Sequence, residues 1–287
     1  MYYPYFRGKQ FDLLALRTLL ENDGLSKKVN PIIEPIKNTA ALHKLLSYAQ
    51  KKQHSFFLVQ NPQLGEFNTL NASILLQELP AKKALLVNQP LETRRSSADL
   101  LVIDQPSIAL ASDWTDNQKP VFIPPEFRLL NKVIGDKIIS QDHFTRLPKL
   151  SFYQACTDEP FSSDHLSYKE KGFLGFSDFS IDSRIYYEKS FPSTLLSLHL
   201  VYFSQEQLRI HHFLSTEEPA TQKEKFLELM QEVCAWQKVL CHESLTKGLS
   251  LLIDYADQKK FPGMGVMRKA SVMHHMELMS RYLEGKS

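Results

Sequence analysis

The sequence has few cysteines, and they form no recognisable set. Its 287 residues include Cys156, Cys234 and Cys241, which cannot pair into a closed set of disulfides and contain no CxxC pair. Two thiols seven residues apart do not make a zinc site. These observations exclude a disulfide scaffold and indicate small buried thiols in a reducing cytoplasm.

Long apolar runs and a strong net charge are also missing. No apolar run approaches the ~20 residues needed to cross a bilayer, and the segment Met1–Arg7 has no signal-peptide core. We therefore expect a cytoplasmic protein with no membrane partner. The net charge of +2 removes the global basicity typical of nucleic-acid-binding domains. Apolar residues make up 43% of the chain, which favours a folded core over disorder.

Short apolar runs recur along the chain and end in a polar residue or proline. Continuous runs of this length are typical of strands buried on both faces. The runs are Pro31–Ile36, Phe56–Pro62, Ala84–Asn88, Leu100–Asp104, Val121–Pro124, Lys137–Asp142, Gly172–Asp178 and Leu196–Tyr202. Eight buried strands separated by helix-length segments predict an α/β fold of the (β/α)8 barrel type, which needs ~250 residues.

Several of the intervening segments have helical spacing. The expected helices are Phe11–Leu20, Thr39–Lys51 with Thr39 as N-cap, Asn71–Leu79, Thr221–Leu240 and Ser244–Lys259. We expect one domain over residues 1–287, with residues 215–287 forming a C-terminal helical segment packed on the barrel.

The barrel pattern has irregularities. Residues 124–136 leave little room for a crossover helix, residues 179–194 do not have a helical pattern, and residues 143–170 form the longest irregular stretch. The segment Leu208–Leu214 looks like a strand that pairs with the eighth run through a turn at residues 204–207. An antiparallel hairpin near the closure predicts a distorted barrel, and a large open α/β sheet is the alternative.

Polar residues at the strand ends are the first candidates for chemistry, since barrel active sites form at the carboxyl ends of the strands. Glu34 lies between Pro31 and Pro35 in a rigid frame, and Asp178 lies among glycines and aromatic residues in the segment 172–179. Both side chains are candidate general bases or metal ligands. The alternative is that strands simply end where polar loops begin, and this reading is favoured for Asn88 and Asp104.

The C-terminal segment Phe261–Met279 is the most distinctive part of the sequence. Its Pro-Gly-Met-Gly turn should begin a helix whose first turns carry Arg268 and Lys269, which are candidate anion-binding residues. His275 is a candidate proton-transfer residue in the same helix. His274 and Glu277 share a helix face and could bind a metal, although a methionine-rich helix packed on the core is the favoured reading.

Three further residues extend the list of candidates. On the strand that includes Arg209, we expect His211 to face the same side as Arg209 and His212 to face the other, so that one histidine reaches the pocket. Arg7 and Lys9 precede the first helix and are candidate anion-binding residues. Ser177 and Ser271 do not lie in a nucleophile-elbow context, which disfavours a serine hydrolase.

Several motifs resemble one known family. They are Tyr2–Arg17, Pro31–Ile36, Asp142–Phe144, Gly175–Phe179, His211–Ser215 and Phe261–Glu277. Together they span nearly the whole chain and resemble the bacterial and phage "beta protein" family, in particular a subgroup that carries the last motif. The resemblance implies a barrel protein that occurs beside small nuclease-like partners, with a role in antiviral or mobile-element defence. The chain departs from the family after Phe144, where Thr145–Ser151 replaces a polar, asparagine-containing stretch.

Two function hypotheses follow. The first is a hydrolase or lyase-type enzyme acting on a phosphorylated or nucleic-acid-derived substrate. Glu34 and Asp178 would supply a base or bind a divalent metal, the four cations would neutralise the anion, and His211 or His275 would transfer a proton. The second is a non-catalytic scaffold or partner subunit of a nuclease-like protein. A direct nucleic-acid binder is a third possibility, and its affinity would fall steeply with salt.

Overall fold

The structure, a computed structural model, describes residues 1–68, 70–92, 96–186, 193–241 and 244–285. The chain divides into two compact units, each with its own sheet. The first comprises Met1–Leu13, Lys27–Asp142 and Asp164–Phe179, and the second comprises Leu14–Ser26, His143–Ser163 and Ser180–Ser287. None of the described helices is long and apolar enough to cross a membrane.

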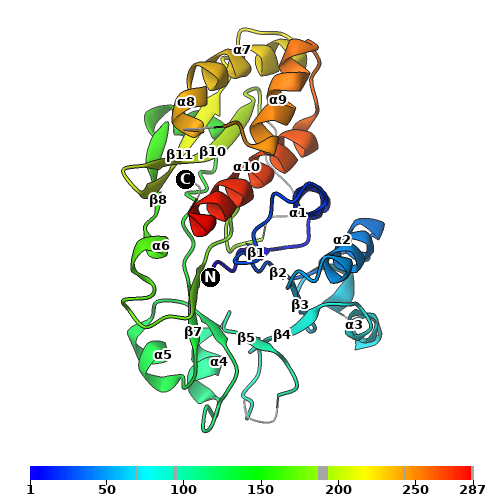
Figure 1. Cartoon of the computed structure of the whole chain (residues 1–287), viewed down its shortest axis with the longest axis vertical. Coiled ribbons are helices and arrows are strands. Elements are labelled where there is room, and N and C mark those ends of the chain that lie inside the picture. The colour runs from blue at the N-terminus through cyan, green and yellow to red at the C-terminus, as the bar shows by residue number, and fades with distance from the viewer. Residues whose placement is uncertain (69, 93–95, 187–192, 242–243, 286–287) are drawn as a thin grey trace. The chain divides into compact units, whose positions relative to one another are not determined.

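The first unit contains eight parallel strands in the order β1-β2-β3-β4-β5-β6-β7-β9 (Figure 1). Their bounds are β1 Tyr5–Phe6, β2 Ile32–Ile33, β3 Phe57–Val59, β4 Lys82–Leu86, β5 Leu100–Val102, β6 Val121–Ile123, β7 Lys137–Ser140 and β9 Gly175–Ser177. The two edge strands approach each other, since the Tyr3 and Tyr5 amides donate to the Phe176 and Asp178 carbonyls at 2.9 Å. The sheet is therefore nearly closed into a barrel, as predicted.

One barrel strand differs from the prediction. Seven of the eight predicted runs form barrel strands, but the run at Leu196–Tyr202 belongs to the second unit. Its place in the barrel is taken by β1 at the N-terminus, whose two residues pair with Ile32 and Ile33. A two-residue strand is too short to produce a periodic signal, which explains why the sequence does not reveal it.

Helices of very unequal length connect the barrel strands. They are α2 Ala40–Lys51, the 3-10 helix η1 Gly65–Asn68, α3 Leu70–Gln77, α4 Pro106–Ala111, α5 Phe127–Lys132 and α6 Asp164–Ser167, while α1 Gln10–Glu21 passes from the first unit into the second. The predicted cap is present, because Thr39 accepts a hydrogen bond from the Leu42 amide. The short α5 agrees with the limited room expected between residues 124 and 136.

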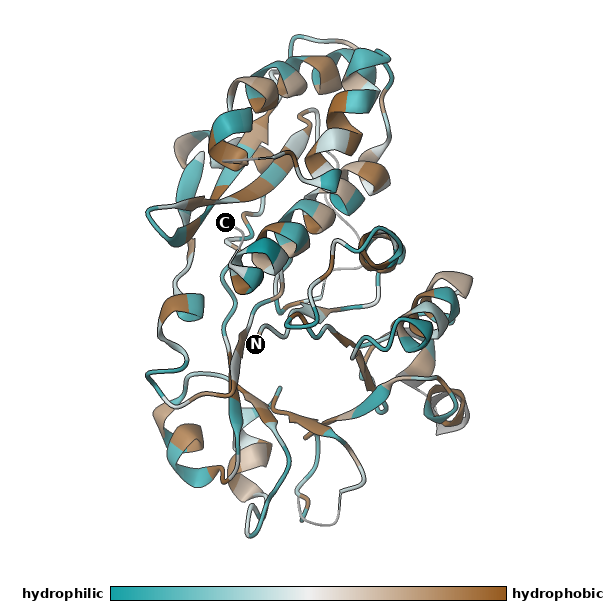
Figure 2. Cartoon of the chain, viewed as in Figure 1, coloured by the Kyte–Doolittle hydropathy of each residue, from teal (hydrophilic) through white to brown (hydrophobic). Residues whose placement is uncertain are grey.

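The barrel interior is filled by apolar and aromatic side chains. Its buried residues are Tyr3, Tyr5, Ile32, Phe57, Val59, Ala84, Leu86, Leu100, Val102, Phe122, Ile138 and Phe179. A second cluster, which includes Trp114 and Leu129, packs α4 and α5 against the outer face of β5 and β6. Figure 2 shows the resulting pattern, with apolar strands and helices that are apolar on one side only. The barrel is thus a packed core and not a pore.

The second unit contains a three-stranded antiparallel sheet in the order β10-β11-β8. The strands β10 (Ser197–Ser204) and β11 (Gln207–Leu214) form the predicted hairpin, with Ser204 opposite Gln207. The third strand, β8 (Asp158–Ser162), comes from the irregular stretch 143–170, as does the 3-10 helix η3 (Leu150–Ala155). Of the segment 179–194, residues 187–192 lie outside the described residues, and the remainder contains no helix.

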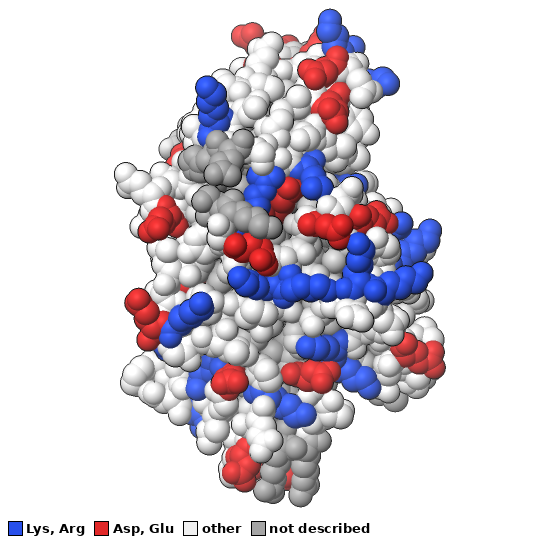
Figure 3. Space-filling view, in the orientation of Figure 1, with Lys and Arg blue, Asp and Glu red and all other residues white. Residues whose placement is uncertain are grey.

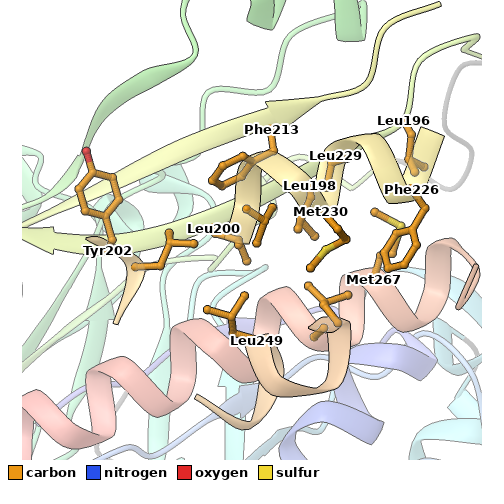
Figure 4. Packing of buried hydrophobic residues seen from close by; sticks show 14 of the residues in the cluster. Leu196, Leu198, Leu200, Tyr202, Phe213, Phe226, Leu229, Met230, Leu249 and Met267 are labelled. Carbon is orange, nitrogen blue, oxygen red and sulfur yellow. The ribbon is translucent and has the colours of Figure 1, made fainter. Parts of the chain in front are cut away.

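Four helices pack on one face of this small sheet. They are α7 Gln222–Ala235, α8 Gln237–Leu240, α9 Lys247–Asp257 and α10 Met264–Glu284. Their core is shown in Figure 4, where Leu198, Leu200 and Phe213 of the sheet meet Phe226, Leu229, Met230, Leu249 and Met267 of the helices. All four helices lie within the predicted helical segment 215–287. Cys241 is buried as expected, but Cys156 and Cys234 are exposed.

Candidate functional site

Glu34 is held at the mouth of the barrel by three donors. It directly follows β2, its side chain is fully buried, and one carboxylate oxygen accepts from the Tyr5 hydroxyl at 2.8 Å and from the Arg7 guanidinium. The other oxygen accepts from the Gln63 amide at 3.1 Å. A buried carboxylate needs such partners to remain charged. The donors come from the end of β1 and from the loop after β3, so Glu34 ties three chain segments together.

Arg7 and Tyr5 complete this polar cluster. Burial by itself would lower the pKa of Arg7, but the charges of Tyr5, Glu34 and Asp104 outweigh it and raise that pKa. Burial and the charge of Glu34 raise the pKa of Tyr5 well above its usual value. Asp104, at the end of the β5 run, is therefore close enough to act on both groups. The Arg7 side chain keeps 12% of its surface exposed, so it is the part of this cluster that reaches the surface.

A loop covers the buried side of this cluster. The Glu66 amide donates to the Ile36 carbonyl at 2.8 Å, and the Glu66 carboxylate accepts from the Asn38 amide at 3.0 Å. Gly65 has φ +75°, and a Cβ atom there would overlap the backbone of Ile36. Only glycine fits so close an approach. This loop thereby fixes the Gln63 amide against Glu34.

Asp178 lies on the other face of the barrel wall. Its carboxylate accepts from the Tyr2 hydroxyl at 2.7 Å, and the Tyr2 ring stacks on Phe176 at 5.0 Å between ring centroids. Neither ring belongs to the interior cluster, whereas Tyr5, the partner of Glu34, does. Side chains alternate between faces along a strand. The two carboxylates therefore do not converge, against the expectation from the strand-end pattern.

His211 belongs to a polar cluster in the second unit. Its Nδ1 atom lies 3.3 Å from Asp158, which also accepts from Arg209 Nε and from the Tyr202 hydroxyl at 2.7 Å each. Desolvation raises the pKa of Asp158, but these three hydrogen bonds outweigh it and lower that pKa. The prediction that Arg209 and His211 share one face is confirmed. The ring of His211 also packs on Trp236 at 3.9 Å.

The two histidines of α10 are fully buried. His275 Nδ1 lies 2.9 Å from the Ser180 hydroxyl, and burial lowers the pKa of its ring to about 3. Both ring nitrogens of His274 have protein partners, Thr246 and the Val201 carbonyl, each at 2.7 Å. Glu277 bonds the first amide of α9 at 2.7 Å. His274 and Glu277 therefore serve the packing of α9 and α10.

The candidate anion-binding residues have different surroundings. Arg268 donates to Asp182 at 2.9 Å. Burial lowers the pKa of the neighbouring Lys269, on which Glu21 and Arg17 of α1 also act. Lys9 lies between β1 and α1, and its carbonyl accepts a hydrogen bond from the Asp12 amide. Arg7 is thus a predicted cation that the structure brings to a predicted acid, Glu34.

The candidates are divided between the two units. Arg7, Lys9, Glu34 and Asp178 belong to the first, and His211, His275, Arg268 and Lys269 belong to the second. Within the described residues, no group of three or more His, Cys, Asp or Glu side chains is arranged to hold a metal ion.

Sequence reasoning missed one cluster, a pair of histidines facing each other across the β10–β11 hairpin. His199 and His212 lie directly opposite in the register, and their Nδ1 atoms are 2.7 Å apart. A signal was present, because both residues stand at equal distance from the turn at residues 205–206. Pairing them required the register as well as the two strands.

The surface carries charges of both signs. Figure 3 shows acidic side chains close to most of the basic ones on the face in view. No family model, no curated protein and no solved structure matches the chain.

Proposed function

We propose that the chain is a barrel enzyme of the hydrolase or lyase type that acts on a phosphorylated or nucleic-acid-derived substrate. The observation that carries the proposal is the Arg7 guanidinium, which is paired with a fully buried Glu34 at the carboxyl ends of β1 and β2. Barrel enzymes place their active sites at this end of the strands. The pair with Glu34 fixes the direction of a planar guanidinium, and its fork of donors matches the geometry of a phosphate group.

The residues of the mouth would divide the work. Arg7 binds the anion, with Lys9 adding positive charge from the same loop. Glu34 already accepts from three donors, so it acts as the positioning residue for Arg7 and not as a base. We assign the proton transfer to Asp104, because its charge acts on both Arg7 and Tyr5. Asp178 has no role in the proposed mechanism, because its carboxylate faces away from the barrel mouth.

The biological setting of the proposal comes from the resemblance to the beta protein family. That resemblance supports a role in antiviral or mobile-element defence, beside a nuclease-like partner. A comparison of hydrolysis rates with and without added Mg²⁺ tests whether the reaction needs a divalent cation.

The test is hydrolysis of 4-nitrophenyl phosphate and bis(4-nitrophenyl) phosphate by the purified chain. Arg7→Gln should reduce the rate about 100-fold, the usual loss when one donor to a developing anion is removed. Asp104→Asn should lower kcat more than KM. The matched control is Arg17→Gln, because Arg17 forms an exposed pair with Glu21 one helical turn away. Equal hydrolysis rates in Arg7→Gln and Arg17→Gln would show that the active site does not lie at the barrel mouth.

A second function, a non-catalytic scaffold, is favoured by one observation. Both strand-end carboxylates singled out by the sequence are engaged by buried tyrosines, Glu34 by Tyr5 and Asp178 by Tyr2. Such networks hold a fold together without any chemistry. Isolation of the chain from its native host would separate the two functions. A stoichiometric protein partner together with no turnover of either substrate supports the scaffold, and turnover lost in Arg7→Gln supports the enzyme.

A further inference from the structure

A hydrogen-bonded chain of two histidines and a glutamate crosses the small sheet of the second unit. His199 Nδ1 lies 2.7 Å from His212 Nδ1, and His212 Nε2 lies 3.3 Å from Glu159 Oε1. The other oxygen of Glu159 accepts from the Thr145 hydroxyl at 3.0 Å. The three residues stand on three adjacent strands, β10, β11 and β8, so the sheet itself fixes their order.

The carboxylate determines the tautomer of each ring. An ionised glutamate only accepts, so His212 must carry its proton on Nε2 and leave a lone pair on Nδ1. That lone pair accepts from Nδ1–H of His199. The lone pair of His199 is then on Nε2. Among the described residues, no protein atom forms a hydrogen bond with His199 Nε2. This nitrogen is also not fully buried.

Aromatic residues hold the rings in place. Tyr153 packs on both, with ring centroids 5.0 Å from His199 and 4.4 Å from His212, and Phe144 meets both edge-on. The Tyr153 ring is itself fixed, because its hydroxyl donates to the Thr145 carbonyl at 2.8 Å. The side chain of His212 is fully buried, whereas His199 is half-buried. The fully buried His212 therefore links two partly exposed ends, the Glu159 carboxylate, whose side chain keeps 17% of its surface exposed, and the His199 imidazole.

We propose that His199 is the accessible base of a second chemical site, which takes a proton from a hydroxyl group or water and passes it through His212 to Glu159. The proton enters at His199 Nε2, the Nδ1 proton of His199 moves to His212 Nδ1, and the Nε2 proton of His212 moves to Glu159. Both imidazole rings end neutral, each in the opposite tautomer, and Glu159 ends protonated. The oxygen of the hydroxyl group or water that lost the proton keeps the electron pair and becomes the nucleophile.

The relay suits the surroundings of His199. Burial, with the charges of His212 and Arg268, lowers the pKa of this histidine to about 3, so a lasting imidazolium is disfavoured there. A proton handed on to Glu159 leaves no charge on either ring. In the catalytic triad of serine proteases the carboxylate orients the histidine and stays ionised; here the low pKa of His199 disfavours an imidazolium, so the proton goes one step further, to Glu159.

The nearby cations indicate the ligand. Arg268 and Arg146 both pair with Asp182, at 2.9 and 3.7 Å, so two guanidinium groups gather beside one carboxylate. The guanidinium groups are partly exposed, at 26% and 29% of their side-chain surface. An arginine pair beside a neutral base fits a ligand with a phosphate group. The site uses residues of the second unit only and does not depend on the barrel mouth.

The test uses diethylpyrocarbonate, which reacts with unprotonated imidazole nitrogens, followed by peptide mapping at neutral pH. We expect His199 to react, the buried His212 to stay unmodified, and inorganic phosphate to slow the reaction at His199 but not at the exposed His43. Arg268→Gln should remove this protection. In Glu159→Gln the reaction at His199 should slow about tenfold, the effect of losing one hydrogen bond to a charged group.

A second measurement needs no variant. Imidazole ¹⁵N spectra of the wild-type protein should show neutral His199 protonated on Nδ1, the less common tautomer, and neutral His212 protonated on Nε2. A neutral His199 protonated on Nε2 would overturn the relay. So would an equal rate of diethylpyrocarbonate modification at His199 in the wild type and in folded Glu159→Gln. Phosphate that protects His199 and His43 equally overturns the choice of ligand.

Discussion

Arg7 and Glu34 follow neighbouring parallel strands and form an ion pair in which the carboxylate is fully buried. The Tyr5 hydroxyl donates to the same oxygen as Arg7 does. In this position the charge of Glu34 depends on its donors, because water does not reach it. The pair therefore has two consequences, one for stability and one for the direction in which Arg7 points.

Glu34→Ala should destabilise the barrel strongly. The substitution removes the Glu34 carboxylate from Arg7 at a site where only 12% of the arginine side chain is exposed, and breaking a buried pair costs about 3 kcal/mol or more. Urea unfolding measures the loss. Glu21→Ala is the control, because its pair with Arg17 is exposed and should contribute no more than ~1 kcal/mol. Equal effects in the two variants would mean that the Glu34 carboxylate is not a structural group.

Tyr2→Phe tests the other strand-end acid. The change removes the Tyr2 hydroxyl as a donor to Asp178, whose side chain is buried, and should cost about 2 kcal/mol. Hydrolysis at the barrel mouth should be unaffected, because Asp178 faces the opposite side of the wall. Tyr48→Phe on α2 is the control and should change stability little. A large loss of turnover in folded Tyr2→Phe would return Asp178 to the list of catalytic residues.

The elements that the sequence revealed are those with a local signal. Thr39 marks the start of α2, and the polar turn between Ser204 and Gln207 marks the hairpin. The strand at Tyr5–Phe6 has no such signal, since its two residues become a strand only by pairing with Ile32 and Ile33. Long-range pairing also decided where the run at Leu196 belongs. A continuous apolar run predicts a buried strand but not the sheet that it joins.

The candidate sites show the same division. Glu34 was recognisable because a carboxylate between prolines is unusual after an apolar run. The roles of Tyr5 and Asp104 depend on which strands meet at the mouth, and that is set by the closure of the barrel. His199 and His212 become partners only through the register of the hairpin, since a shift of one residue would place them on opposite faces.

Gly248→Ala should destabilise the second unit. A Cβ atom at this position of α9 would lie 2.6 Å from the His274 amide nitrogen and closer still to the Ala270 carbonyl, both in the backbone of α10. Backbone atoms cannot move aside, so the helices must separate, at a cost of about 1–3 kcal/mol. This exceeds the gain of ~1 kcal/mol from replacing glycine within a helix. Ser250→Ala on the same helix is the control, and thermal unfolding of both variants would show whether the contact is as close as described.

The protein should lose stability as the pH falls below 6.5. Burial lowers the pKa of His274 to about 4 and that of His275 to about 3, from 6.5. The unfolded chain therefore binds more protons than the folded one below pH 6.5. The free energy of unfolding must decrease as the pH falls from there towards 4, by up to roughly 1 kcal/mol per histidine and pH unit.

A comparison of variants separates the histidine contribution to the loss of stability at low pH from the contribution of the carboxylates. His275→Leu removes one titrating ring, so its unfolding free energy should change less between pH 6.5 and 4 than that of the wild type, whatever its stability at pH 7. His43→Gln, at an exposed position, should keep the wild-type slope. Parallel profiles for wild type and His275→Leu would mean that His275 is protonated in the folded state. In that case a buried imidazolium in α10 would need a counter-ion close to His275.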